Sequence, residues 1–146
     1  MVSTLKGRTV IAGQTEGRVL LAGRSISFWG GVDPTSGQII DTRHDRHGES
    51  VAGRIFALPS EKGSSTGSAI LLELIRVGRA PAAIIMLRLA PILALGAIVA
   101  EELYGLTIPI VQLSEADFKR LSDGEQVHIF ADGTIQLQDC RTIGPS

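Results

Sequence analysis

The stretch Leu58-Pro59-Ser60-Glu61-Lys62-Gly63-Ser64-Ser65-Thr66-Gly67-Ser68 separates a strand-like run, residues 51–58, from a helix-like run that continues to residue 78. In the second run, apolar residues recur at the spacing of one helical face: Ile70, Leu71, Leu74 and Val77. Pro59 ends the strand, and Gly63 and Gly67 allow the backbone to turn tightly. The sequence therefore predicts a strand, a turn and a helix from about residue 65 to residue 77.

The start of the predicted helix is suited to two kinds of chemistry. A first helical turn has free N–H groups and the positive end of the helix dipole, which attract anions and favour a serine that has lost its proton. Ser and Thr are also ordinary helix caps, so a capped helix after a glycine-rich turn explains the same residues. Four hydroxyl side chains between Ser64 and Ser68 favour a functional site.

Strands and helices alternate after this stretch, and strands dominate before it. The pattern predicts a buried strand at 82–87, a helix at 92–104 ended by Gly105, and a further strand at 108–113. Ser114 is expected to cap a short helix, and a turn at 131–133 to join a hairpin. Four short upstream strands are expected, at 8–11, 18–21, 25–29 and 38–41. The predicted fold class is α/β, a layered β/β/α architecture in one domain over residues 1–146.

Length, charge and composition exclude several classes of function. The 146 residues are 44% hydrophobic, which suffices for one domain with a core. A net charge of -1 and 4% aromatic residues argue against binding to nucleic acid. The N-terminus lacks a signal core, and Arg88 and Pro91 interrupt the apolar run 81–100, so no membrane span and a cytoplasmic location are expected. The single cysteine, Cys140, can form no intrachain disulfide and cannot hold zinc or an iron–sulfur cluster by itself.

Other polar groups have both a functional and a plain interpretation. His44 and His47 share a polar loop with several carboxylates, which suits either a metal site or a histidine that fixes a turn. Glu101 and Glu102 are adjacent on a helix and point about 100° apart, so an exposed edge fits better than an acid–base pair. The segment 62–65 lacks the order of a phosphate-binding loop, and no nucleophile elbow is present.

Several stretches taken together resemble the small subunit of the aconitase X dehydratases. They are Ser27-Phe28-Trp29-Gly30-Gly31-Val32-Asp33-Pro34, Gly37-Gln38-Ile39-Ile40-Asp41, Gly53-Arg54, residues 62–68, Ala80-Pro81-Ala82-Ala83-Ile84-Ile85 and residues 95–105. The resemblance covers most of the chain and implies the swivelling β/β/α domain of aconitases as a separate polypeptide. It also implies a large partner subunit that holds an iron or iron–sulfur centre, with no metal bound by this chain alone.

The resemblance implies roles for the serine-rich stretch. The catalytic serine of the family falls on Ser65, and we expect Lys62, Gly63 and Ser64 to bind the substrate. The implied reaction dehydrates a small hydroxy acid: Ser65 takes a weakly acidic proton, and the iron of the partner takes the hydroxyl group. The helix dipole and N–H donors near Ser64 and Gly67 would favour the charged form of Ser65.

Two substrate branches belong to this resemblance: cis-3-hydroxy-L-proline, dehydrated to pyrroline-2-carboxylate in bacteria, and 5-phosphomevalonate in archaea. We expect the first, because 11 arginines against 3 lysines do not suggest a hyperthermophilic source. A phosphate also needs cations, and Lys62 is the one cation near the serine-rich stretch in sequence. The remaining alternatives are the small subunit of 5-phosphomevalonate dehydratase and a non-catalytic anion-binding or scaffolding subunit.

Overall fold

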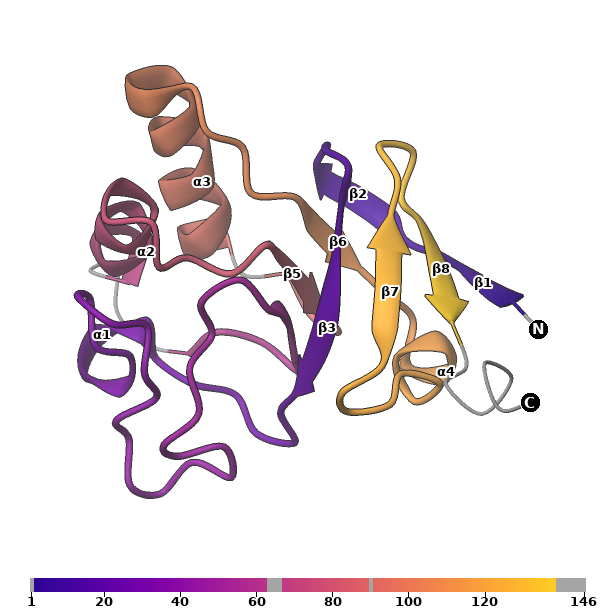
Figure 1. Cartoon of the computed structure of the whole chain (residues 1–146), viewed down its shortest axis with the longest axis horizontal. Helices are drawn as coiled ribbons and strands as arrows, with labels where there is room; N and C mark the ends of the chain where they lie inside the picture. Colours follow the sequence, from indigo (N-terminus) through magenta and orange to yellow (C-terminus); the bar gives the residue numbers. More distant parts are fainter. Residues whose placement is uncertain (1, 63–66, 90, 139–146) are drawn as a thin grey trace.

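The computed structural model describes residues 2–62, 67–89 and 91–138. Helices α2 and α3 lie on one side of the central strands, and β1, β7, β8 and α4 lie on the other (Figure 1). The strands are β1 (Val2–Lys6), β2 (Arg8–Ile11), β3 (Thr15–Leu21), β4 (Ile55–Leu58), β5 (Ala83–Met86), β6 (Ile110–Gln112), β7 (Gln126–Ile129) and β8 (Thr134–Gln138). The helices are α1 (Phe28–Gly31), α2 (Gly67–Arg76), α3 (Pro91–Tyr104) and α4 (Glu115–Phe118). The predicted α/β fold with β/β/α layers is confirmed.

The strand order is β1-β8-β7-β3-β4-β5-β6-β2. Strands β3, β4, β5 and β6 run parallel, whereas β1, β8 and β7 pair antiparallel. Strand β3 belongs to both parts: Thr15–Arg18 pairs with β7, and Val19–Leu21 pairs with β4. Only Gly7 separates β1 from β2, so one extended segment pairs with the strands at both ends of the order.

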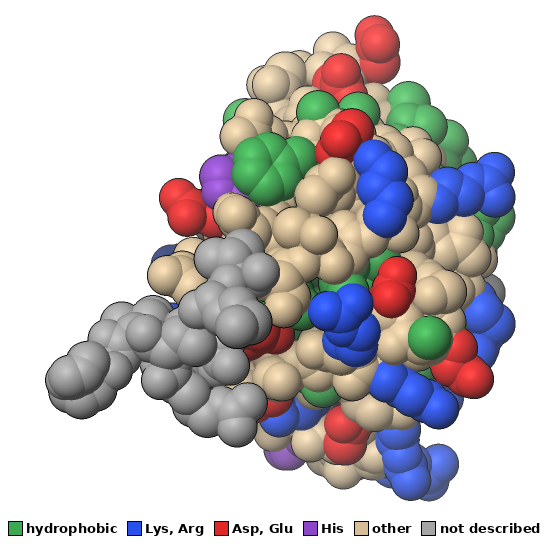
Figure 2. All heavy atoms as spheres, turned by 90° about the vertical axis from the view of Figure 1, so that its right-hand side faces the viewer, with side chains coloured by type: hydrophobic (Ala, Val, Ile, Leu, Met, Phe, Trp, Pro, Cys, Tyr) green, Lys and Arg blue, Asp and Glu red, His purple; other side chains and the backbone are tan. Residues whose placement is uncertain are grey.

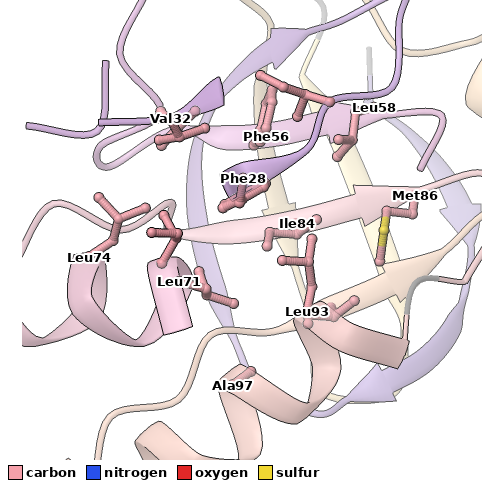
Figure 3. Close-up of a cluster of buried hydrophobic side chains, with 14 of the residues drawn as sticks. Phe28, Val32, Phe56, Leu58, Leu71, Leu74, Ile84, Met86, Leu93 and Ala97 are labelled. Atoms are coloured by element: carbon pink, nitrogen blue, oxygen red, sulfur yellow. The ribbon is translucent and has the colours of Figure 1, made fainter. Parts of the chain in front are cut away.

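The core lies on both faces of the parallel strands, because side chains alternate along each strand. On β4 and β5, Phe56, Leu58, Ile84 and Met86 face the helices (Figure 3). Their neighbours in sequence, Ile55, Ala57, Ala83 and Ile85, face the antiparallel layer. All four residues of each strand are buried, which explains the uninterrupted apolar runs in the sequence.

Most of the predicted elements are present. The helix predicted at 65–77 corresponds to α2, and that at 92–104 to α3, which is followed by Gly105 with φ of 68°. Ser114 caps α4 as predicted, since its hydroxyl accepts a hydrogen bond of 3.2 Å from the Asp117 N–H. The hairpin across residues 131–133 joins β7 to β8.

Two of the predicted upstream strands are wrong. Within residues 25–29, Ile26 makes one bridge to Glu61, and Phe28 already begins α1. Within residues 38–41, isolated bridges replace a strand. Gly30 has φ of 80° and a following turn is closed by Asp33, so this glycine-rich segment folds into successive turns in which no ladder of hydrogen bonds develops.

Candidate functional site

The carboxyl ends of the parallel strands lie at one edge of the sheet, which is where ligands bind in open α/β folds. The segments that follow β3, β4 and β5 are tied together there. The Lys62 N–H donates to the Ile26 carbonyl oxygen at 3.0 Å, and the Arg88 N–H donates to that of Pro59 at 2.9 Å. The segment that leads into the serine-rich stretch is therefore held on both sides by the backbone.

Glu61 is the buried anchor of that segment. It is 8% exposed, and its Oε2 accepts a hydrogen bond of 3.3 Å from the Phe28 N–H. Burial raises the pKa of this carboxyl group, and the bond from Phe28 partly opposes that effect. A Cβ atom on Gly67 would lie 2.7 Å from Glu61 Oε2, so a side chain where α2 begins would have to displace the Glu61 carboxylate.

The first turn of α2 is also held by α3. A Cβ atom on Gly96 would lie 2.7 Å from the Ser68 carbonyl oxygen, so a side chain at this position would push the two helices apart. Leu71 and Leu74 of α2 and Leu93 and Ala97 of α3 point into the same core (Figure 3). Core packing and two glycine contacts thus fix the point from which α2 starts.

Of the four residues predicted for the site, one can be located. Ser65, Gly63 and Ser64 lie outside the described residues. Lys62 is exposed and lines a cavity of about 600 Å³ at the ends of β3 and β4. The other residues of the cavity wall are Arg24, Ser25, Asp41, Thr42, Arg43 and His44.

Sequence reasoning missed two cationic residues of this cavity, Arg24 and Arg43. They come from separate loops, and no motif or period marks them as neighbours of Lys62. Lys62 is the one cation near the serine-rich stretch along the chain, and in the structure it shares this cavity with the two arginines. The Arg24 Nη1 donates to the Arg43 carbonyl oxygen at 2.9 Å, and Asp41 Oδ1 accepts from the Arg43 N–H at 2.9 Å.

His44 fixes the loop behind this wall. It is 5% exposed, and its Nδ1 accepts a hydrogen bond of 3.0 Å from the Arg46 N–H. The proton of the neutral ring is therefore assigned to Nε2, which donates to the Arg24 carbonyl oxygen at 3.0 Å. Asp45 Oδ2 accepts from the Gly23 N–H at 2.7 Å and joins the same two loops. With both ring nitrogens engaged, His44 matches the turn-fixing interpretation.

The residues available here do not fit a metal centre. Within the described ranges, no three His, Cys, Asp or Glu side chains are grouped so as to hold a metal ion. His47 is exposed in the same loop, and Cys140 lies outside the described residues. An iron centre of the kind implied by the resemblance therefore has no ligand set in this part of the chain.

Two exposed features lie outside this cavity wall. Glu101 and Glu102 are both exposed at the end of α3, as predicted. Trp29 is 58% exposed, so its side chain is not part of the core. No helix within the described ranges has both the length and the apolar character needed to cross a membrane.

Comparison with known proteins gives a consistent result. The family described as Aconitase X swivel domain matches residues 4–137. The chain is 50% identical over 130 residues to the cis-3-hydroxy-L-proline dehydratase of Pseudomonas aeruginosa, covering 89% of this chain and 22% of that protein. It is 39% identical over 135 residues to the phosphomevalonate dehydratase small subunit of Methanosarcina acetivorans, covering 91% and 90% of the two chains.

A solved structure agrees with these matches. The crystal structure of Thermococcus kodakaraensis aconitase X in its holo-form has a TM-score of 0.84 and 36% sequence identity, over 94% of this chain and 99% of that one. The chain spans only 22% and 23% of the first two curated relatives, both cis-3-hydroxy-L-proline dehydratases. This domain is thus part of a longer polypeptide in some relatives and nearly a whole polypeptide in others.

Proposed function

The chain belongs to the aconitase X swivel domain family, and from this premise we propose that it is the small subunit of a dehydratase that removes water from cis-3-hydroxy-L-proline. The observation that carries the proposal is the 50% sequence identity between this chain and the Pseudomonas aeruginosa enzyme of that name. The small subunits among its relatives, which this chain matches over nearly their whole length, support a separate polypeptide that acts with a larger partner in a heterodimer. A cytoplasmic location is part of the same proposal.

In this proposal, Ser65 supplies the base. The proton to be removed lies on the carbon that carries the substrate carboxylate. The Ser65 oxygen takes that proton, the electron pair of the C–H bond forms the carbon–carbon double bond, and hydroxide leaves the neighbouring carbon. Support comes from the fixed start of α2, since free N–H groups and the helix dipole lower the cost of a charged serine. Lys62, Gly63 and Ser64 are proposed to bind the substrate beside it.

The iron or iron–sulfur centre is proposed to belong to the partner subunit. The described residues of this chain offer no ligand set for it, so no catalytic step of this chain is assigned through it. The contribution of this chain is the serine base and the polar surface around it. Contact with the partner is proposed to include Trp29, because its large apolar side chain is exposed on the same turn that borders Glu61.

Reconstitution tests the proposal. The chain is co-purified with the large subunit and assayed for loss of water from cis-3-hydroxy-L-proline. We expect turnover by the pair and none by this chain alone. Ser65→Ala should lower kcat roughly a hundredfold to ten-thousandfold, the usual contribution of a positioned base. Ser60→Ala is the matched control, because the Ser60 hydroxyl donates to the Arg88 carbonyl oxygen at 3.2 Å and no catalytic role is proposed for it.

Three outcomes would contradict parts of the proposal. Dehydration by this chain alone excludes the two-subunit arrangement. Near-normal turnover by Ser65→Ala moves the base elsewhere and favours a non-catalytic scaffolding or anion-binding subunit. Turnover of 5-phosphomevalonate without turnover of cis-3-hydroxy-L-proline selects the second candidate, the small subunit of phosphomevalonate dehydratase, which the match to such subunits over 90% of their length favours.

A further inference from the structure

The cavity at the ends of β3 and β4 concentrates positive charge. Three cationic side chains line it, Arg24, Arg43 and Lys62, and one carboxylate, Asp41. The whole chain carries a net charge of -1, so this concentration is local. Among the described residues, no carboxylate forms an ion pair with any of these three cations. Such a grouping raises the local concentration of an anionic ligand.

The wall that carries the cations is held in place before any ligand arrives. The Arg24 guanidinium bonds the Arg43 carbonyl oxygen, and Asp41 accepts from the Arg43 N–H. Behind them, His44 holds the Arg24 carbonyl oxygen, and Asp45 holds the Gly23 N–H. The backbone on both sides of the cavity is therefore fixed by hydrogen bonds, which lowers the entropy that a ligand would otherwise lose in ordering it.

We propose that this cavity binds the carboxylate of the substrate, with Arg24, Arg43 and Lys62 as its cationic partners; the inference rests on the proposed function. Both candidate substrates carry a carboxylate on the carbon that loses its proton, so the same site serves either branch. Guanidinium groups match a carboxylate with two parallel hydrogen bonds, and a lysine adds a point charge. The volume of about 600 Å³ lies within the range of small-molecule sites.

The position of the cavity agrees with this assignment. Lys62 stands on its wall and directly precedes the serine-rich stretch in the chain. Arg24 and Arg43 thereby acquire a role in positioning the substrate that no sequence motif indicates.

Direct binding to the 146-residue chain tests the assignment without any turnover. The probe is pyrrole-2-carboxylate, a planar ring of the size of the product, and the uncharged control is pyrrole-2-carboxamide. Backbone amide resonances are followed during each titration. We expect the carboxylate to shift the amides of residues 23–25, 41–44 and 62, and the carboxamide to leave them unchanged.

Matched variants identify the cations. Arg24→Gln and Arg43→Gln should each weaken binding of the carboxylate about tenfold, as expected for the loss of a charge-assisted hydrogen bond. Arg8→Gln is the control, because Arg8 is also exposed but lines a different hollow, near the ends of β5 and β6. The amide spectrum of each free variant shows whether its fold is intact, and substitutions of exposed residues seldom disturb folding.

The outcomes are distinguishable from failure of the proposed function. Equal shifts with carboxylate and carboxamide, no shifts with either, or full affinity in both arginine variants would overturn the carboxylate site. In the reconstituted enzyme, Arg43→Gln should raise KM with little change in kcat, since the carboxylate is charged throughout the reaction. If the wild-type pair turns over neither substrate while the probe still binds as described, the proposed reaction fails and the carboxylate site stands.

Discussion

Two regions of the molecule differ in whether their cationic side chains are paired with carboxylates. Where β1 passes into β2, Lys6 lies 3.2 Å from the Asp132 carboxylate and also donates to the Asp132 carbonyl oxygen at 2.9 Å. At the cavity, Arg24, Arg43 and Lys62 have no such carboxylate partner among the described residues. A cation that is paired supports the local fold, whereas cations kept from carboxylates remain available to a ligand.

On the surface on the side of β1 and β8, opposite charges are mixed over a larger area. In Figure 2, which views the molecule from that side, acidic and basic side chains are interspersed. The backbones also approach closely near this face, since the Gly7 N–H donates to the Gly133 carbonyl oxygen at 2.9 Å. We call the contact between Gly7 and Gly133 the closing corner. We expect the closing corner to contribute to the stability of the fold, and we expect the cavity to contribute to ligand binding.

The largest effect on stability is expected at the closing corner. Gly133 has φ of 91°, and a Cβ atom there would collide with the Gly7 carbonyl oxygen. Gly133→Ala should therefore lower the free energy of unfolding by about 3 kcal/mol, measured by urea denaturation. Binding of pyrrole-2-carboxylate should persist under conditions where this variant is folded.

Gly48 provides a closely matched control in the loop behind the cavity. Its φ is 92°, nearly that of Gly133, but a Cβ atom there would meet nothing within 4 Å. Gly48→Ala should lower the free energy of unfolding by only about 1 kcal/mol, because alanine disfavours a positive φ but meets no steric clash there. Equal losses in the two variants would show that the close approach at the corner adds nothing and would break the comparison.

A smaller effect is expected from the link behind the cavity. Asp45→Ala removes the acceptor of the Gly23 N–H and should lower the free energy of unfolding by about 1 kcal/mol. It should also weaken binding of the carboxylate probe, because Arg24 directly follows Gly23. Hydrogen exchange of the Gly23 amide measures the lost bond. Asp33→Ala is the control, since the Asp33 carboxylate accepts hydrogen bonds from the Thr35 N–H and hydroxyl, two residues along the chain; weaker probe binding in this variant as well would contradict the role of Asp45.

Features of the fold that depend on nearby residues could be predicted from the sequence, whereas the cavity could not. Strand β5 and helix α3 were predicted almost to their ends, because period and apolar content reflect burial of one face or of both. Ser114 and the hairpin turn were predicted from local chemistry. These features depend on neighbours within a few residues.

The cavity depends on neighbours far apart in sequence. Arg24 follows β3, Lys62 follows β4, and Arg43 lies in the long loop between those strands. They meet because β3 and β4 pair in parallel and the loop is pinned by His44, and neither fact leaves a local pattern. The strand predicted at 25–29 was wrong for a related reason, since its single bridge is made to Glu61, a residue far along the chain. The roles predicted for Ser65, Gly63 and Ser64 stay predictions.

Glu61 gives a smaller, pH-dependent effect beside the cavity. Burial raises its pKa in the folded chain above the ordinary value of 4.5. The folded chain favours the protonated form of Glu61. The stabilisation from this form is therefore fully present below pH 4.5 and is lost as the pH rises through the pKa of the folded chain. Glu61→Gln keeps an acceptor for the Phe28 N–H and should flatten this dependence, with a change of about 1 kcal/mol or less at pH 7. Urea denaturation between pH 4 and about pH 8 measures it; an unchanged slope in the variant would exclude Glu61 as its source.

The smallest effect belongs to Asp132 at the closing corner, and its sign is opposite. Hydrogen bonds from the backbone and hydroxyl of Thr134, and from Lys6, lower the pKa of Asp132 from 3.8 to about 2. The stabilising charged form is therefore present above pH 3.8 and is lost as the pH falls toward 2. The group is fully exposed, so solvent screens the pair and the effect on unfolding is expected to be slight.

The titration itself is the sharper measurement. The carboxyl carbon of Asp132, followed by NMR, should titrate near pH 2, and Lys6→Gln should raise this midpoint only modestly. The Thr134 N–H, at 2.9 Å from Asp132 Oδ1, is the leading cause and remains in that variant. Thr134→Val, which keeps the N–H and removes the hydroxyl, should also raise the midpoint. A midpoint that returns to 3.8 in Lys6→Gln would mean that the ion pair, and not the turn, controls this charge.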